Sequence, residues 1–139
     1  PMLDADANEA ISQAWAIGWD AIHGDSSGDA VADVLEGEIG DAGSEWVRMA
    51  IVPSVSQLQT LDAQQRERTA IISVQIFTLP VSNTRRVSEL VDDVRSVLEA
   101  KVFASSSERI WTMAATATPG VNDGAWVMRL VTVPCRWYG

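Results

Sequence analysis

One change of hydrophobic period, at Pro80, constrains this chain more than any other feature of its sequence. Before Pro80, the residues from Arg66 to Leu79 alternate between apolar and polar side chains, which is the period of a strand. The apolar side chains on one face of that strand are Ile72, Val74 and Ile76. After Pro80, a segment capped by Asn83 or Thr84 and ending near Phe103 repeats at the period of a helix. Its apolar stripe comprises Val87, Leu90, Val91, Val94 and Leu98. The sequence therefore predicts a strand followed closely by an amphipathic helix.

Weaker patterns predict the remaining elements. A first helix is expected from after Asp4 to about Ile22, with acidic residues near its start, where the helix dipole favours them. A first strand is expected from Glu45 to Pro53. The last third of the chain reads as a hairpin. Its parts are a strand at Arg109–Thr118, a turn at Pro119–Gly124 and a strand at Ala125–Trp137.

Two segments are predicted to be connections. The stretch from Gly24 to Gly43 is rich in glycine and acidic residues, and we expect a long loop with at most one helical turn. Residues Ser54 to Gln65 form a long polar connection between the first two strands.

The order of elements is therefore α-β-β-α-β-β. Strands joined in hairpins favour an antiparallel sheet, so we expect an α+β fold with helices packed on a four-stranded antiparallel sheet. The 139 residues are the usual size of one domain, and the 47% of apolar residues can form a core. A single domain spanning 1–139 is predicted.

Two of the expected strands are apolar on both sides. The strand at Glu45–Pro53 places Trp46 and Val52 opposite Val47 and Ile51. The last strand likewise sets Trp126, Met128 and Leu130 against Val131, Val133, Cys135 and Trp137. A sheet covered on one face alone should alternate with polar residues. Either helices or loops cover both faces, or a second copy does; oligomerisation is the preferred interpretation, because tryptophan is enriched at interfaces.

Charge is distributed unevenly along the chain. Up to Glu45 there are eleven acidic residues and no lysine or arginine, whereas the rest has eight acidic and ten basic residues, which together give the net charge of −9. So negative a protein does not favour tight binding of nucleic acid. The acidic part serves solubility alone, or it meets the basic part of a neighbouring copy.

Four arginines extend the second interpretation. Arg85 and Arg86 open the second helix, where the dipole disfavours cations, although Arg85 can pair with Glu89 one turn later. Either solvent screens these charges, or they and the arginines that begin the second strand meet an acidic partner. The predicted subunit or partner interface comprises Trp46, Arg66, Arg68, Arg85, Arg86, Trp126, Met128 and Trp137.

The residues suggest no catalytic set. His23, the one histidine, is expected to be an ordinary surface residue, and Cys135 a small buried apolar residue. Neither glycine-rich phosphate-binding pattern occurs in the sequence. We therefore expect that the protein is not an enzyme and that it binds no cofactor.

One loop has the spacing of a calcium site. Oxygen-bearing residues occupy five of the ligand positions of an EF-hand, but Ala30 stands where the sharp turn requires glycine. The five residues are Asp25, Ser27, Asp29, Asp33 and Glu36. A calcium-binding or small-ligand-binding module is therefore an alternative.

Three segments together resemble the phage tail terminator proteins. They are the run from Arg68 to Phe77 (RTAIISVQIF), the helix from Arg85 to Arg95 (RRVSELVDDVR) and the closing run from Trp126 to Trp137 (WVMRLVTVPCRW). In that family a strand of the form x-V-Q-I-F leads into a helix similar to L-x-D-x-V-R, and a V-x-V-P-x-R strand ends the chain. The order of elements is similar too.

The resemblance implies a structural virion protein rather than an enzyme. Such proteins form a ring of six copies on the head-proximal end of the tail tube, stop its polymerisation and present a surface to the head-completion protein. The implied partners are further copies of the chain, the tail tube protein and the head-completion protein, with no membrane. DNA would pass through the ring without specific binding. The implied location is the virion tail, assembled in the host cytoplasm, and another phage neck or tail-completion protein is the alternative.

Overall fold

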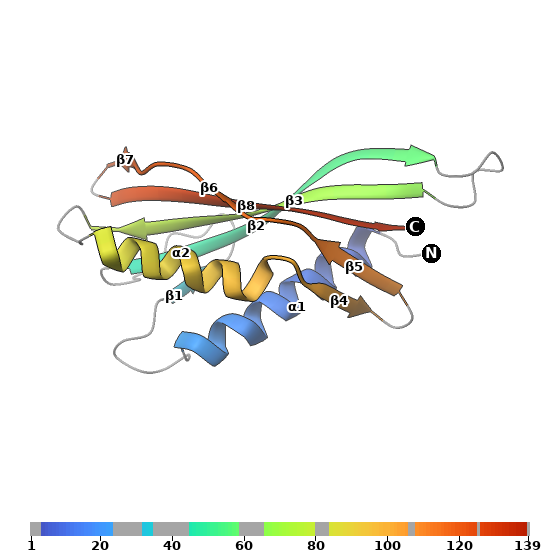
Figure 1. Cartoon of the computed structure of the whole chain (residues 1–139), viewed down its shortest axis with the longest axis horizontal. Helices are drawn as coiled ribbons and strands as arrows, with labels where there is room; N and C mark the ends of the chain where they lie inside the picture. The colour runs from blue at the N-terminus through green and yellow to red at the C-terminus, as the bar shows by residue number, and fades with distance from the viewer. Residues whose placement is uncertain are drawn as a thin grey trace.

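The molecule has two layers, a twisted sheet with both helices on one face (Figure 1). The computed structural model describes residues 4–23, 32–34, 45–58, 66–79, 84–105, 108–124 and 126–138. In chain order the elements are α1 (Asp4–His23), β1 (Ala32–Val34), β2 (Glu45–Leu58), β3 (Arg66–Thr78), α2 (Thr84–Leu98), β4 (Val102–Ser105), β5 (Glu108–Thr112), β6 (Thr116–Ala117), β7 (Val121–Asp123) and β8 (Trp126–Tyr138).

The sheet confirms the α+β class and corrects its details. Within the described ranges it has eight strands in the order β1-β2-β3-β8-β5-β4, with β6 and β7 also paired to β8. The strand β1 is parallel to β2, whereas every other pairing is antiparallel. The prediction of four strands was therefore wrong, although the long strands β2, β3 and β8 were expected.

Two of the extra strands, β6 and β7, arise because the partner of β8 is broken. Between the pairs Val121↔Met128 and Ala117↔Val131, the partner segment advances four positions while β8 advances three. The same mismatch recurs between Thr116↔Thr132 and Thr112↔Cys135. Each mismatch is a bulge of one residue, which interrupts the ladder locally. The expected strand at Arg109–Thr118 is thus divided into β5 and β6, and part of the expected turn is the strand β7.

The helix boundaries agree with the sequence except at one end. The first helix was predicted well, and α2 begins at Thr84, one of the two expected caps. Its predicted end near Phe103 was wrong, because α2 ends at Leu98. Ala100 then takes a left-handed conformation with φ of 52°, which a helix does not continue through. The chain leaves directly into β4, a strand that the sequence did not predict.

Parts of both expected loops are strands. Residues 32–34 form β1 on the edge of the sheet, and residues 54–58 continue β2 beyond its expected end at Pro53. The remainder of each predicted connection lies outside the described residues.

The main core lies between the helices and the sheet. The stripe of α1, the stripe of α2 and the helix-facing side chains of the three long strands meet there. Among the fully buried side chains of these elements are Ile11, Trp15, Trp19, Leu90, Val94, Ile72, Val74, Ile76, Val131 and Val133. Trp15 and Trp19 stack on each other with ring centroids 4.9 Å apart, so one helix supplies two of the largest core side chains.

The two helices approach closely at Gly18. A β-carbon placed there would lie 2.7 Å from Cγ1 of Val97 on α2, closer than carbon atoms pack. The small residue therefore sets the distance between the helices.

We predict that Gly18→Ala lowers the free energy of unfolding by about 1 kcal/mol. The new methyl overpacks against Val97, at a cost of about 1–3 kcal/mol, and alanine returns about 1 kcal/mol of helix propensity. In a Val97→Ala background the clash is gone, so the same exchange should stabilise by roughly 0.5–1 kcal/mol. Urea unfolding of the four chains measures both effects. An equal effect of Gly18→Ala in both backgrounds would contradict this helix contact.

Candidate functional site

The second face of the sheet carries its own ordered set of side chains. Pairing places Trp46, Phe77 and Met128 in one row across β2, β3 and β8. Their neighbours along each strand, such as Val47 and Ile76, point into the main core. Because both helices lie on the other side (Figure 1), we call the face with Trp46 and Phe77 the open face.

One end of the open face is an aromatic cluster. Trp46 and Phe77 stack with centroids 3.9 Å apart and planes at 7°, and Trp126 meets Trp46 edge-on at 6.0 Å. The guanidinium of Arg48 lies 5.9 Å from the ring centroid of Trp46 and 5.5 Å from that of Phe77. These cation–π contacts and the aromatic packing hold this end of the sheet in a fixed form.

Further along the same face lies a row of exposed apolar residues. Val52 pairs with Ile71, and Ile71 pairs with Pro134, so the three side chains are direct neighbours across β2, β3 and β8. Val52 is 52% exposed and Ile71 is 40% exposed, and Pro134 is exposed as well. We call these three residues the apolar row. Contiguous exposed apolar side chains are typical of a surface that binds another protein.

Two arginines lie on the open face on either side of the apolar row. Arg48 is four positions before Val52 on β2, and its Nε donates a 2.8 Å hydrogen bond to Oε1 of Gln75. Arg136 is two positions after Pro134 on β8 and is exposed. The face therefore presents an apolar centre with a cation at each side.

The aromatic residues of the predicted interface differ in how deeply they are buried. Trp46 is 3% exposed in the aromatic cluster, and Trp137 is 2% exposed in the main core. Neither offers surface to a partner, so their part of the interface prediction is wrong: packing within the chain accounts for both. Trp126 and Met128 are partly buried and stay at the edge of the aromatic cluster on the open face.

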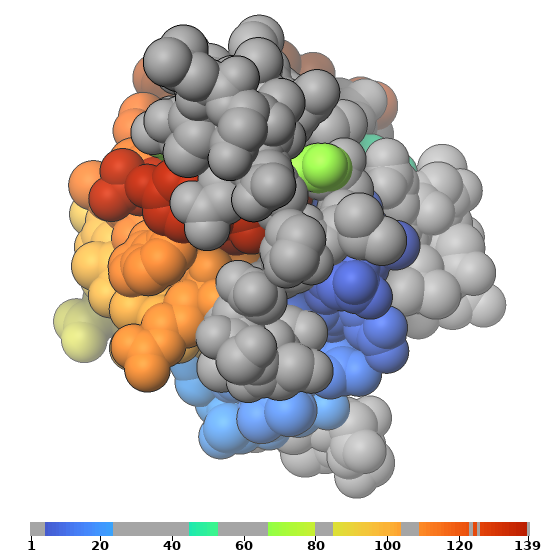
Figure 2. All heavy atoms as spheres, turned by 90° about the vertical axis from the view of Figure 1, so that its right-hand side faces the viewer, coloured from blue at the N-terminus to red at the C-terminus, as the bar shows by residue number. Residues whose placement is uncertain are grey.

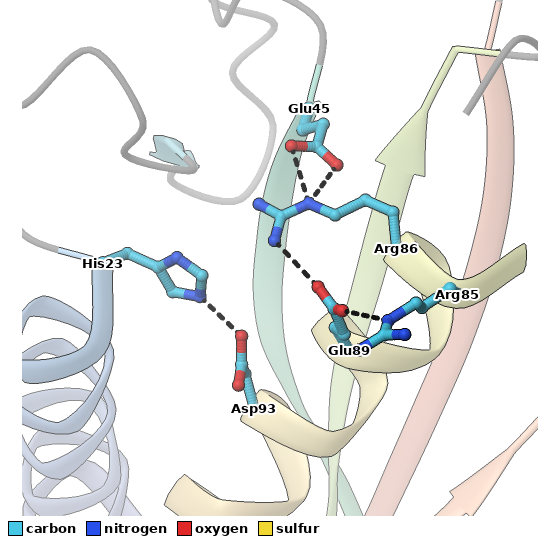
Figure 3. A network of polar contacts seen from close by, with 6 residues as sticks. All are labelled: His23, Glu45, Arg85, Arg86, Glu89 and Asp93. Carbon is cyan, nitrogen blue, oxygen red and sulfur yellow. Dashed lines mark hydrogen bonds and ion pairs between the residues drawn. The ribbon is translucent and has the colours of Figure 1, made fainter. Parts of the chain in front are cut away.

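Arg86 is paired inside the chain. Its Nε donates to both carboxylate oxygens of Glu45, at 2.8 Å and 3.1 Å, and its Nη1 lies 3.5 Å from Oε2 of Glu89 (Figure 3). The hydrogen bonds to Glu45 raise the pKa of Arg86. The sequence suggested that Arg86 meets an acidic group of a partner, but its acidic group is Glu45 of the same chain. The pair joins α2 to the start of β2.

The other three arginines differ in their surroundings. Arg85 is exposed and bonds Glu89 at 3.1 Å, as the helical spacing predicted. Arg68 is half-buried, pairs in register with Trp137 and already has an interaction within the chain. The side chain of Arg66 lies outside the described residues.

His23 is not the surface residue that the sequence indicated. Its side chain is only 8% exposed, with Nε2 3.0 Å from Oδ2 of Asp93 on α2 and the ring 4.2 Å from that of Trp19. Figure 3 shows this contact bridging the two helices. The residue therefore joins the C-terminal end of α1 to α2.

Cys135 is buried in the main core, as predicted. Burial raises the pKa of its thiol to about 11. The thiol is therefore protonated at neutral pH, and the nucleophilic thiolate form is scarce.

The remaining candidate sites are only partly described. Of the calcium-loop residues, Asp33 lies in β1, and Asp25, Ser27, Asp29 and Glu36 lie outside the described residues. Within the described ranges no group of three or more His, Cys, Asp or Glu side chains could hold a metal ion. Neither described helix combines the length and apolar character needed to cross a bilayer.

The sequence missed the apolar row, although it carried a signal. Val52 was recognised as part of a two-sided strand, whereas Ile71 and Pro134 were not singled out. The signal is the Ile71–Ile72 pair, which breaks the alternation of β3 by placing an isoleucine on each face.

Comparison with known proteins identifies the fold but no family. No protein-family model matches the sequence, and no curated protein matches it. Seven chains of solved structures match. One of them aligns with a TM-score of 0.75 at 9% sequence identity, over 99% of this chain and 96% of that chain. The likeness shows that the whole arrangement of elements recurs in another protein.

We predict unequal effects for the two arginines that open α2. Arg86→Ala should lower the free energy of unfolding by about 1–2 kcal/mol, because it leaves the mostly buried Glu45 carboxylate unpaired. Arg85→Ala, the matched control, should cost under about 0.5 kcal/mol, as expected for an exposed i,i+4 pair. Chemical denaturation of the two variants measures the difference. Equal losses would show that the Arg86–Glu45 pair does not fasten α2 to the sheet.

Proposed function

We propose that this protein is a structural component of phage tails that caps the tail tube as a ring of six copies. In this role it stops tube polymerisation and provides the surface on which the head is joined. Its partners are further copies of itself, the tail tube protein and the head-completion protein.

The observation that carries the proposal is the apolar row on the open face. The exposed row of Val52, Ile71 and Pro134 leaves apolar area in contact with water, and an assembly protein can bury this area against a partner. The burial of apolar area is the main favourable contribution to protein association. This supports a role in assembly, and the resemblance of the three sequence segments supports the tail as the place of assembly.

The charge of the chain is compatible with this role. DNA must move through the ring during packaging and ejection, so binding along its path would slow it. A net charge of −9 repels the phosphate backbone, and the described basic residues are few and partly paired with carboxylates.

A tube-capping assay tests the proposal. Tail tube protein of the same phage is polymerised with and without this protein, and tube lengths are measured by electron microscopy. We expect tubes that stop growing, with a ring of density at one end. Ile71→Lys should remove the effect without unfolding the chain, because the side chain is already 40% exposed.

The control for this assay is Ser88→Lys, which adds the same charge at an exposed position on α2. It should cap tubes like the wild type. Unchanged tube growth with the wild-type protein, or a ring at the distal end of the tube, would contradict the terminator role and favour another neck or tail-completion function.

A further inference from the structure

The outward side of α1 carries a ridge of exposed residues at helical spacing. They are Asp6, Glu9, Gln13, Ile17 and Asp20. Positions three or four apart lie on one side of a helix, and the residues that α1 buries, such as Ile11 and Trp15, occupy the opposite side. We call these five residues the acidic ridge. Three of them are acidic, none is basic, and Ile17 is 73% exposed.

The acidic ridge and the open face lie on opposite sides of the molecule. In both views α1 lies on the lower side of the strands and runs obliquely, so that its C-terminal part is farther from them than its N-terminal end (Figures 1 and 2). One copy can therefore use both surfaces at once, each toward a different neighbour.

The two surfaces are complementary in character. The acidic ridge has an exposed isoleucine with acidic residues on both sides of it. The open face has the apolar row with an arginine on either side, Arg48 and Arg136. Opposite charges bordering two apolar centres favour one relative orientation of the surfaces.

The spacing of these groups is similar along the helix and along the strands, and the row itself spans about 10 Å across the strands from Val52 to Pro134, so the ridge would cross them obliquely. At a rise of about 1.5 Å per residue, Glu9 and Asp20 lie about 12 Å and about 4.5 Å from Ile17 along the helix, on opposite sides of it. At about 3.3 Å per residue, Arg48 lies about 13 Å from Val52, and Arg136 about 7 Å from Pro134. The two arginines lie on opposite sides of the row because β2 and β8 run in the same direction, each being antiparallel to β3.

We propose that the acidic ridge of one copy docks on the open face of the next copy. Ile17 lies on the apolar row, Glu9 faces Arg48 and Asp20 faces Arg136. The contact is heterologous, because each copy contributes two different surfaces, so its repetition gives a ring when the rotation closes. The inference rests on the proposed function in taking this chain as one that assembles with itself.

Reciprocal charge reversal tests this contact. One variant carries Glu9→Arg and Asp20→Arg, so that its ridge and its open face are both positive. The other carries Arg48→Glu and Arg136→Glu, so that both of its surfaces are negative. Each variant alone should remain monomeric under conditions in which the wild type assembles, since like charges meet at every contact. Mixed together, they should form complexes with equal numbers of the two chains, identified by native mass spectrometry.

Two controls accompany the mixture. The first control variant carries Asp92→Arg, the same substitution as at Asp20 but at an exposed position of α2. This variant should assemble like the wild type. Thermal unfolding checks that each variant is folded; because Arg48 contacts the aromatic cluster, Arg136→Glu alone is included as a variant that leaves those contacts intact. The Arg136→Glu variant should need at least a tenfold higher protein concentration than the wild type to assemble.

The outcomes separate this contact from the proposed function. Assembly of either double variant alone, a mixture that remains monomeric, or a monomeric wild type at the highest concentration would each overturn the contact. Tube capping that persists in both double variants would overturn the contact and leave the terminator role standing. Alternating complexes from a protein that never caps tubes would support the contact and overturn the terminator role.

Discussion

The pairing of β3 with both β2 and β8 determines which side chains enter the core and which remain on the open face. The ladder with β8 runs without a break from Glu67↔Tyr138 to Thr78↔Val127. A slip of one residue would turn every side chain of β3 to the other face, moving Ile72, Val74 and Ile76 out of the core. Each of these side chains contributes about 1.5–3 kcal/mol when buried, so the register is strongly specified. That register also places Val52, Ile71 and Pro134 side by side on the open face.

The helices fix which face remains open. Three contacts join them to each other and to the sheet: the close approach of Gly18 to Val97, the contact of His23 with Asp93, and the Arg86–Glu45 pair. All lie on the same side of the sheet. The polar side chains of these contacts, His23, Asp93, Arg86 and Glu45, are thus engaged within the chain. On the open face, by contrast, the side chains of the apolar row remain exposed.

Much of the fold could be predicted from the sequence because local periodicity determined it. Alternation identified β3, and the apolar stripe identified α2, in each case with a correct start. The short strands β1, β4 and β7 and the break between β5 and β6 were not found, because the interruptions in the partner of β8 and the left-handed turn at Ala100 have no signal in the local periodicity. Residue type alone also failed for the interface: a tryptophan such as Trp137 fills a core as readily as a contact surface. The two-sided character of the strands was the reliable signal, and it identified the open face but not the row within it.

Whether this chain assembles with copies of itself can be read from the mass of the protein in solution. Light scattering coupled to size-exclusion chromatography, repeated over a wide range of concentrations, gives that mass without any partner protein. Self-assembly into the proposed ring should give a discrete species of six copies whose mass stops increasing once the ring has closed. A monomer at every concentration, or a mass that increases without limit, would contradict it.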